Sequence, residues 1–223
     1  MALRFIIFDL DETIYPRGNG LLQEVGHRIQ LWVQQQFDLT WEEAAAMRRD
    51  YFLRYGTTMG GLIAEHDVDV HEYLVFVHDV PLGDYLASNP ALAAMLDGIP
   101  LQKAIYTNGT AEHGWRVLQA LGVADHFERV IGIEDVGLRN KPYLDAYEQM
   151  LALLGAQGPE CIMVEDSARN LRPAKVLGLT TVLVDAEPDE HENRSVDFVV
   201  ESVLDVGEVV GDLLLASYEP HSI

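Results

Sequence analysis

Asp9 and Asp11, one residue apart, stand at the end of an apolar run at residues 5–8, and the hydroxyl of Thr13 comes shortly after them. Carboxylates this close repel each other, and a bound cation or a shared proton relieves the repulsion. Because the stretch offers only oxygen ligands, we expect the cation to be Mg²⁺. The apolar run is typical of a strand covered on both faces, so it predicts a buried strand that delivers Asp9 into a catalytic pocket.

Two other interpretations of this stretch need weighing. An EF-hand calcium loop has the same aspartate spacing, but Ile14 stands where that loop requires Gly, and Gly20 where it requires Glu. The sequence therefore excludes an EF-hand. A solvated acidic turn stays open for these ten residues taken alone, and the rest of the chain weighs against it.

A neutral anion-binding corner and a lysine follow further along the chain. Thr107 and Asn108 come at the end of one predicted strand, just before a helix N-terminus, which is a place that favours an anion, although Asn-Gly also occurs in plain turns. Lys141 stands at the start of another predicted helix, where the helix dipole disfavours a cation. This unfavourable position is a small argument that Lys141 has a role.

A second acidic strand end supports a shared cation. Glu165 and Asp166 follow the apolar run at residues 161–164, as Asp9 follows the first run. Two acidic strand ends in one sheet indicate one cation between them. With the lysine and the anion-binding corner, this set of groups matches phosphoryl transfer through an acyl-phosphate, which requires charge neutralisation around the transferring group.

The elements that must position these residues fall into two groups. Residues 16–90 show helical spacing of apolar residues, with a capping box at Thr40 and Glu43 and an expected loop at residues 57–61. Beyond them, strands alternate with helices, and the further strands are expected at residues 103–107, 129–133, 161–164, 181–184 and 197–200. This alternation predicts a mainly parallel sheet, and the helical insertion should lie over the carboxyl edge of the sheet as a lid.

Composition narrows the classes of partner. The 223 residues include 15 Lys and Arg against 36 Asp and Glu, a formal charge of −21. Such a charge opposes binding to nucleic acid polymers and to anionic membranes. The single cysteine, Cys161, is compatible with a reducing cytoplasm, and the first apolar run is too short for a signal peptide or a membrane span. We therefore expect a cytoplasmic protein, and nothing in the sequence indicates its oligomeric state.

Four motifs, in order and over nearly the whole chain, resemble those of the haloacid dehalogenase-like hydrolase superfamily. They are Phe8-Asp9-Leu10-Asp11-Glu12-Thr13, Tyr106-Thr107-Asn108-Gly109, Lys141-Pro142 and Val164-Glu165-Asp166-Ser167. The stretches at residues 14–16, 55–62 and 165–171 also resemble the pyrimidine 5′-nucleotidase branch. The resemblance implies an α/β fold with a Rossmannoid core at residues 1–15 and 91–223 and a helical cap at residues 16–90. Leu144 departs from the more usual Lys-Pro-x-Pro, but the lysine is retained.

The resemblance also implies a role for each motif residue. Asp9 would attack the substrate phosphorus, and Asp11 would protonate the leaving group and then deprotonate water. Thr107, Asn108 and Lys141 would hold the phosphoryl oxygens.

The metal and the substrate are implied in the same way. Mg²⁺ would bind the Asp9 carboxylate, the Asp11 backbone carbonyl and Asp166, with Glu165 reaching it through water, and Thr13 would fix the loop geometry. In the cap, the residues implied in specificity are Met59, Gly60 and Gly61. The expected function is a Mg²⁺-dependent phosphatase of small phosphorylated metabolites that forms an aspartyl-phosphate, with UMP and CMP as leading substrates.

Several alternatives stay open. Haloacid dehalogenases lack a carboxylate equivalent to Asp11, because a halide leaving group needs no proton, so dehalogenation is disfavoured. A sugar-phosphate phosphatase or a phosphoglucomutase-like enzyme would keep all four motifs. A non-catalytic phospholigand-binding protein would have no need of both aspartates. Tyr15, Arg17 and Arg54 could touch substrate, but a core or surface role is the simpler interpretation of each.

Overall fold

The computed structural model describes residues 2–184 and 195–218. The core range expected at 91–223 thus includes residues 185–194 and 219–223, which lie outside the described residues. Within the described part, six parallel strands form one sheet in the order β3-β2-β1-β4-β5-β6. The strands are β1 (Phe5–Phe8), β2 (Gln102–Tyr106), β3 (Arg129–Ile131), β4 (Cys161–Glu165), β5 (Thr180–Val184) and β6 (Phe198–Val200). The predicted α/β fold with a mainly parallel sheet is confirmed.

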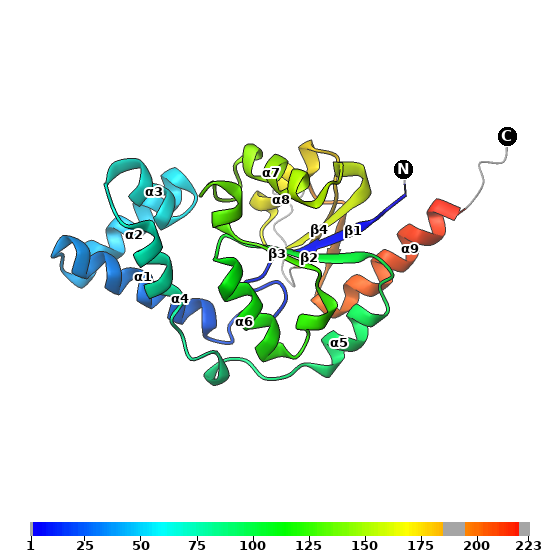
Figure 1. Ribbon diagram of the computed structural model, residues 1–223, viewed down its shortest axis with the longest axis horizontal. Helices are drawn as coiled ribbons and strands as arrows, with labels where there is room; N and C mark the ends of the chain where they lie inside the picture. Colours follow the sequence, from blue (N-terminus) through cyan, green and yellow to red (C-terminus); the bar gives the residue numbers. More distant parts are fainter. Residues whose placement is uncertain (1, 185–194, 219–223) are drawn as a thin grey trace.

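The helices fall into two groups along the chain. Those between β1 and β2 are α1 (Leu21–Phe37), α2 (Trp41–Tyr55), α3 (Thr58–Glu65), α4 (Val70–His78) and α5 (Pro90–Asp97). Those after β2 are α6 (Ala111–Leu121), α7 (Leu144–Leu154), α8 (Ala168–Val176) and α9 (Val206–Tyr218). Helices α1–α4 gather at one end of the molecule, away from the sheet (Figure 1). None of the described helices is long and apolar enough to cross a membrane.

Strand β1 is buried on both faces, which explains its unbroken apolar run. Ile6 and Phe8 belong to the hydrophobic cluster that includes buried residues of α5, α6 and α9. Phe5 and Ile7 belong to the cluster on the other face, with buried residues of α7 and α8. Successive side chains of a strand point to opposite faces, so four apolar residues in a row fill both layers of core.

Helix α3 corrects the loop expected at residues 57–61. The helix begins one residue after Thr57, whose Oγ1 accepts a 2.9 Å hydrogen bond from the backbone N–H of Gly60. A Cβ atom on Gly61 would lie 2.2 Å from Tyr51 Cγ on α2. The two glycines look like helix breakers in the sequence, but Gly61 is needed because α3 packs so closely on α2 that no side chain fits between them.

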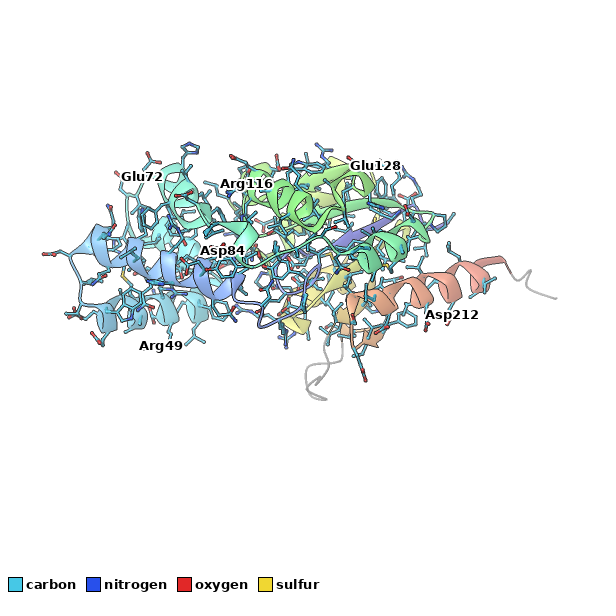
Figure 2. The ribbon with its side chains drawn as sticks, turned by 90° about the horizontal axis from the view of Figure 1, so that it is seen from below. Arg49, Glu72, Asp84, Arg116, Glu128 and Asp212 are labelled. Atoms are coloured by element: carbon cyan, nitrogen blue, oxygen red, sulfur yellow. The ribbon has the colours of Figure 1, made fainter. Side chains whose placement is uncertain are left out.

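Arginine side chains link the helical insertion to the core where the chain returns from α4. Arg116, on α6, donates hydrogen bonds of 3.0 Å to the carbonyl oxygens of His78 and Val80. Figure 2 shows Arg116 between the α1–α4 group and the sheet region. Arg28 of α1 donates to the carbonyl oxygen of Phe76 over 2.8 Å. The Arg116 contacts join the end of α4 to the core, and the Arg28 contact joins α1 to α4 within the insertion.

Candidate active site

The carboxyl ends of three neighbouring strands bring the predicted residues together. Strand β1 lies between β2 and β4, so Asp9, Thr107 and Asp166 follow adjacent strands at one edge of the sheet. The Asp9 backbone N–H donates a 2.8 Å hydrogen bond to the carbonyl oxygen of Val164. Ligands of open α/β sheets bind at this edge.

Lys141 is the cation at the centre of the cluster. Its side chain is 2% exposed, and its ammonium group contacts Asp9 Oδ1, Glu165 Oε1 at 2.8 Å and the Tyr106 carbonyl oxygen at 3.2 Å. Burial lowers the pKa of Lys141, but the negative charges of Asp9 and Glu165 raise it by more than burial lowers it. The pKa of Lys141 therefore lies above the ordinary value. Lys141 is therefore a permanently charged partner of two buried carboxylates.

Asp9 is almost enclosed. The residue is 6% exposed, and its Oδ2 accepts a hydrogen bond from Thr13 Oγ1 at 3.3 Å. Burial raises the pKa of Asp9 well above its ordinary value, Lys141 opposes the rise, and Glu165 adds to it. Additional positive charge at the site would therefore favour the ionised form of Asp9.

Asp11 is held by a neighbouring phenol. The Tyr15 hydroxyl donates a 2.5 Å hydrogen bond to Asp11 Oδ1, and Tyr15 is 1% exposed. Burial raises the pKa of Asp11, and the hydrogen bond from Tyr15 lowers it. A carboxyl group with a raised pKa can exchange protons closer to neutral pH, as a general acid and base must.

Asp166 is paired with an arginine from the loop after β1. Arg17 Nη2 lies 2.8 Å from Asp166 Oδ2 and 2.7 Å from its backbone oxygen. Burial raises the pKa of Asp166 to about 7, with a further rise from Glu165, whereas Arg17 lowers it. This ion pair links the loop that follows the first motif to the last of the predicted motifs.

Three carboxylates could hold a metal ion. Asp9, Glu165 and Asp166 each offer an oxygen atom, and these atoms lie within 4.8 Å of one another. Both Glu165 oxygens already accept hydrogen bonds, Oε1 from Lys141 and Asn170 and Oε2 from the Ser167 backbone. Both Asp9 oxygens accept hydrogen bonds as well, Oδ1 from Lys141 and Oδ2 from Thr13, and Asp166 Oδ2 accepts one from Arg17. An all-oxygen set of this kind suits a hard cation such as Mg²⁺.

The turn after β2 contributes the neutral corner. Thr107 Oγ1 accepts a 2.9 Å hydrogen bond from the Gly109 backbone N–H. Asn108 Oδ1 accepts a 2.7 Å hydrogen bond from the Lys141 backbone N–H, so the turn is fixed to the segment that carries the lysine. Thr107 is 1% exposed.

A cavity of about 290 Å³ opens beside these residues, between the core and helices α1–α4. Of the residues predicted from the sequence, Asp11, Asn108 and Met59 line it. Asp9, Thr107, Lys141 and Asp166 do not line it but are joined to that wall through the contacts above. Gly60 and Gly61 do not line it either, and a Cβ atom on Gly60 would lie 3.0 Å from Asn140 Oδ1.

Two asparagines that the sequence analysis did not single out support the cluster. Asn170 Nδ2 donates to Glu165 Oε1 over 2.6 Å. Asn140 Nδ2 donates to the Lys141 carbonyl oxygen over 2.7 Å and to the Tyr55 carbonyl oxygen at the end of α2 over 3.2 Å. Asn140 is adjacent to Lys141 in sequence, but only the fold shows that it also reaches helix α2.

Comparison with known proteins agrees with this geometry. The family model for haloacid dehalogenase-like hydrolases matches residues 3–178. Phosphate metabolism protein 8 of Saccharomyces cerevisiae is 23% identical over an alignment of 212 residues that covers 87% of this chain and 65% of the yeast protein. Glyceraldehyde 3-phosphate phosphatase of Methanothermobacter thermautotrophicus is 23% identical over an alignment of 228 residues that covers 95% of this chain and 96% of that protein.

A solved structure shares the fold. The crystal structure of a HAD phosphatase from Thermococcus onnurineus superposes with a TM-score of 0.65 at 18% sequence identity, covering 94% of this chain and 98% of that one. At this identity the likeness shows the arrangement of helices and strands.

Proposed function

Because the chain belongs to the haloacid dehalogenase-like hydrolases, we propose that it is a Mg²⁺-dependent phosphatase of small phosphate monoesters that works through an aspartyl-phosphate. Its leading substrates are the pyrimidine nucleoside monophosphates UMP and CMP. In this proposal residues 1–15 and 91–223 form the catalytic core, and residues 16–90 form a cap that closes over it.

The observation that carries the proposal is the pairing of two aspartates with different surroundings. Asp9 is fixed by Lys141 and Thr13, as a nucleophile must be, whereas Asp11 lines the cavity and is held by Tyr15. Two carboxylates with separate partners can take separate roles, one in bond formation and one in proton transfer.

In the first step an Asp9 carboxylate oxygen attacks the substrate phosphorus. The bond from phosphorus to the leaving oxygen breaks, and that oxygen takes the proton of the Asp11 carboxyl group. The products are the free alcohol, the aspartyl-phosphate on Asp9 and an ionised Asp11.

In the second step Asp11 acts as a base. It removes a proton from a water molecule whose oxygen attacks the phosphorus, and the bond between phosphorus and Asp9 breaks. Inorganic phosphate leaves, and Asp11 has regained its proton. One residue serves both steps because the first leaves it in the form that the second requires.

The remaining residues would stabilise the negative charge of the phosphoryl group. Lys141, Thr107 and Asn108 would bind the phosphoryl oxygens as negative charge develops on them. Mg²⁺ would be held by Asp9 and Asp166, with the Asp11 backbone carbonyl and with Glu165 through water, and when bound it supplies positive charge that neutralises the phosphate. The segment Met59–Gly61 would contribute to specificity through Met59, which lines the cavity.

Sugar phosphates are the second candidate class. The relative named glyceraldehyde 3-phosphate phosphatase aligns over 95% of this chain, and the same core residues would serve either leaving group. A mutase that returns the phosphate to a sugar would use them as well.

The decisive experiment measures inorganic phosphate released from UMP, CMP, AMP, GMP and a set of sugar phosphates, with Mg²⁺ and with EDTA. Asp9→Asn is compared with wild type, and Asp212→Asn is the matched control because Asp212 is exposed on α9, far from the site (Figure 2). We expect metal-dependent release from UMP and CMP that is lost in Asp9→Asn and kept in Asp212→Asn.

Each other outcome removes part of the proposal. Release from sugar phosphates alone would keep the chemistry and reject the nucleotidase assignment. Turnover that survives the loss of Asp9 would overturn the mechanism. Phosphate retained in a sugar product would identify a mutase.

A further inference from the structure

Arg48 of α2 lines the same cavity as Asp11. Its Nη1 donates to Gln30 Oε1 over 3.0 Å, whereas its Nε is buried and has no hydrogen-bond partner among the described residues. A buried N–H group without an acceptor is costly and rare in native proteins. The position is therefore suited to an acceptor that arrives with a ligand.

The guanidinium of Arg48 also lacks a counter-ion within the described part of the chain. Several other arginines of this acidic protein pair with carboxylates, as Arg17 does with Asp166 and Arg139 with Asp145. Arg48 is held by a neutral amide instead. Its charge is thus still available to a ligand with partial or full negative charge.

Two residues of α1 hold Arg48 in this position. Gln30 is 8% exposed, and its Nε2 donates to the Trp41 carbonyl oxygen over 2.9 Å, which turns its Oε1 toward Arg48. A Cβ atom on Gly26 would lie 3.3 Å from Arg48 Nη2. Glycine weakens a helix interior relative to alanine, and here it leaves room for the guanidinium. The arginine is therefore preorganised rather than loosely attached.

The rest of the cavity wall is largely apolar. Phe52, one helical turn after Arg48, also lines the cavity, and its side chain is 55% exposed. The aliphatic and thioether side chains of the wall are Leu22, Val25, Ile29, Met59, Leu74 and Val77. Ligand sites combine such a wall with a few placed polar groups. A planar ring with acceptors on its edge would cover this wall, whereas a two-carbon phospho-acid would leave most of it bare.

We propose that Arg48 recognises the leaving group by donating hydrogen bonds to the O2 carbonyl oxygen, which cytosine and uracil share. Two N–H groups of its planar fork can converge on this one oxygen, which has two lone pairs. This inference rests on the proposed function and adds which chemical group of the substrate is recognised by the helical insertion.

The test compares substrates that share the phosphate and the sugar but differ in the base. Steady-state kinetics are measured for CMP, UMP, ribose 5-phosphate and 2-phosphoglycolate with wild type, Arg48→Met, Arg48→Lys and Arg49→Met. Arg49 carries the same charge at the neighbouring position, is exposed and does not line the cavity (Figure 2). We expect Arg48→Met to lower kcat/KM for CMP and UMP by about 10- to 100-fold, mainly through KM, since hydrogen bonds to charged groups have this strength.

The same variant should keep kcat/KM for ribose 5-phosphate within about twofold of the wild-type value, because that substrate has no base for Arg48 to contact. Arg48→Lys should recover part of the loss, and Arg49→Met should match wild type. An equal loss on ribose 5-phosphate would show a merely structural role and overturn the proposal, as would no loss on any substrate. A loss of kcat/KM for 2-phosphoglycolate but not for the nucleotides would show that Arg48 binds a substrate carboxylate. That result would also overturn the proposal.

A binding measurement separates this inference from the proposed function. Calorimetry with Asp9→Asn, with and without Arg48→Met, gives the affinity for CMP and for ribose 5-phosphate without requiring turnover. Wild type that binds CMP through Arg48 but releases no phosphate would refute the phosphatase and retain the recognition. Equal CMP affinity in the two variants would refute the recognition even where phosphate release is normal.

Discussion

The Tyr15 hydroxyl donates a 2.5 Å hydrogen bond to Asp11 Oδ1, and both residues belong to the loop that follows β1. The contact joins residues four apart in sequence, so it is set by the conformation of this loop alone. The hydrogen bond fixes one oxygen of Asp11. It also lowers the pKa of the Asp11 carboxyl group, whereas burial raises that pKa. Tyr15 therefore positions the proposed general acid without needing to contact substrate.

Tyr15→Phe removes this hydrogen bond while keeping the ring. We expect kcat to fall by about 10- to 100-fold, since general acid catalysis contributes about 10²- to 10⁴-fold and Asp11 would be misplaced rather than lost. Because the lost bond lowers the pKa of Asp11, its removal raises that pKa. The limb of the pH–rate profile that belongs to Asp11 should move to higher pH.

Tyr106→Phe is the matched control for Tyr15→Phe. The Tyr106 hydroxyl is also buried, but it has no hydrogen-bond partner within residues 2–184 and 195–218, so its loss should leave kcat and the pH–rate profile close to wild type. A Tyr15→Phe variant with the wild-type profile would contradict the positioning role.

Lys141→Met leaves two buried carboxylates facing each other without their cation. Removing one partner of a buried ion pair destabilises a protein by about 3 to 5 kcal/mol, and Lys141 is 2% exposed. The remaining pair would share a proton, so the folded-state pKa of one carboxyl group would exceed its unfolded value. The loss of stability should therefore be larger at pH 8 than at pH 5, as measured by urea denaturation.

A second substitution separates charge from packing at Lys141. Lys141→Met/Glu165→Gln removes one of the two facing carboxylates and should recover part of the stability of Lys141→Met. Lys175→Met is the exposed comparison, because its ion pair with Asp197 lies at the surface and should contribute at most about 1 kcal/mol. Equal losses for Lys141→Met and Lys175→Met would refute the buried cluster.

The strands were predictable because their apolar runs are short and their ends are marked by polar residues. Residues 5–8 and 161–164 each end at carboxylates, and parallel strands bring such ends to one edge of a sheet. The contact of Lys141 with Asp9 spans 132 positions, and no local pattern specifies it. The motif resemblance placed both residues in one site, but the pairing itself comes from the fold.

Helix α3 and Arg48 show what local patterns miss. Two adjacent glycines indicate a loop, because their helix propensity is low, but the contact with Tyr51 makes Gly61 necessary in a helix. Arg48 looks like any exposed arginine of an amphipathic helix, and its role depends on Gly26 and Gln30 of another helix. Both cases are set by packing between helices, which residue spacing along one helix does not encode.

Gly61→Ala tests the close packing of α3 on α2. The added Cβ atom would lie 2.2 Å from Tyr51 Cγ, so a helix or the tyrosine must shift. We expect a loss of about 1 to 3 kcal/mol in unfolding free energy, although alanine has the better helix propensity. Gly83→Ala is the control, because nothing lies within 4 Å of its added Cβ. A Gly61→Ala variant with unchanged Tm would contradict this account of α3.

His113→Phe tests a stacked histidine pair at the junction between the helical insertion and the core. The rings of His78 and His113 lie 4.5 Å apart at 25°, and neither His113 nitrogen has a hydrogen-bond partner in the described part of the chain. Burial lowers the pKa of each to about 4, against an ordinary value of about 6.5. The unfolded chain thus binds more protons than the folded one between these values, and stability is lost as pH falls through this window.

As pH falls through this window, each histidine can lower the free energy of unfolding by up to about 2 to 3 kcal/mol. The reason is that one proton bound by the unfolded chain alone changes this free energy by about 1.4 kcal/mol per pH unit. The buried carboxylates titrate in the opposite sense, but they are common to wild type and variant and cancel in the difference. Urea unfolding at pH 7.5, 6 and 4.5 should therefore show His113→Phe losing less stability than wild type toward low pH. His27→Gln, with its side chain 57% exposed, should follow wild type. The same pH dependence in His113→Phe and wild type would show that this pair is not buried in its neutral form.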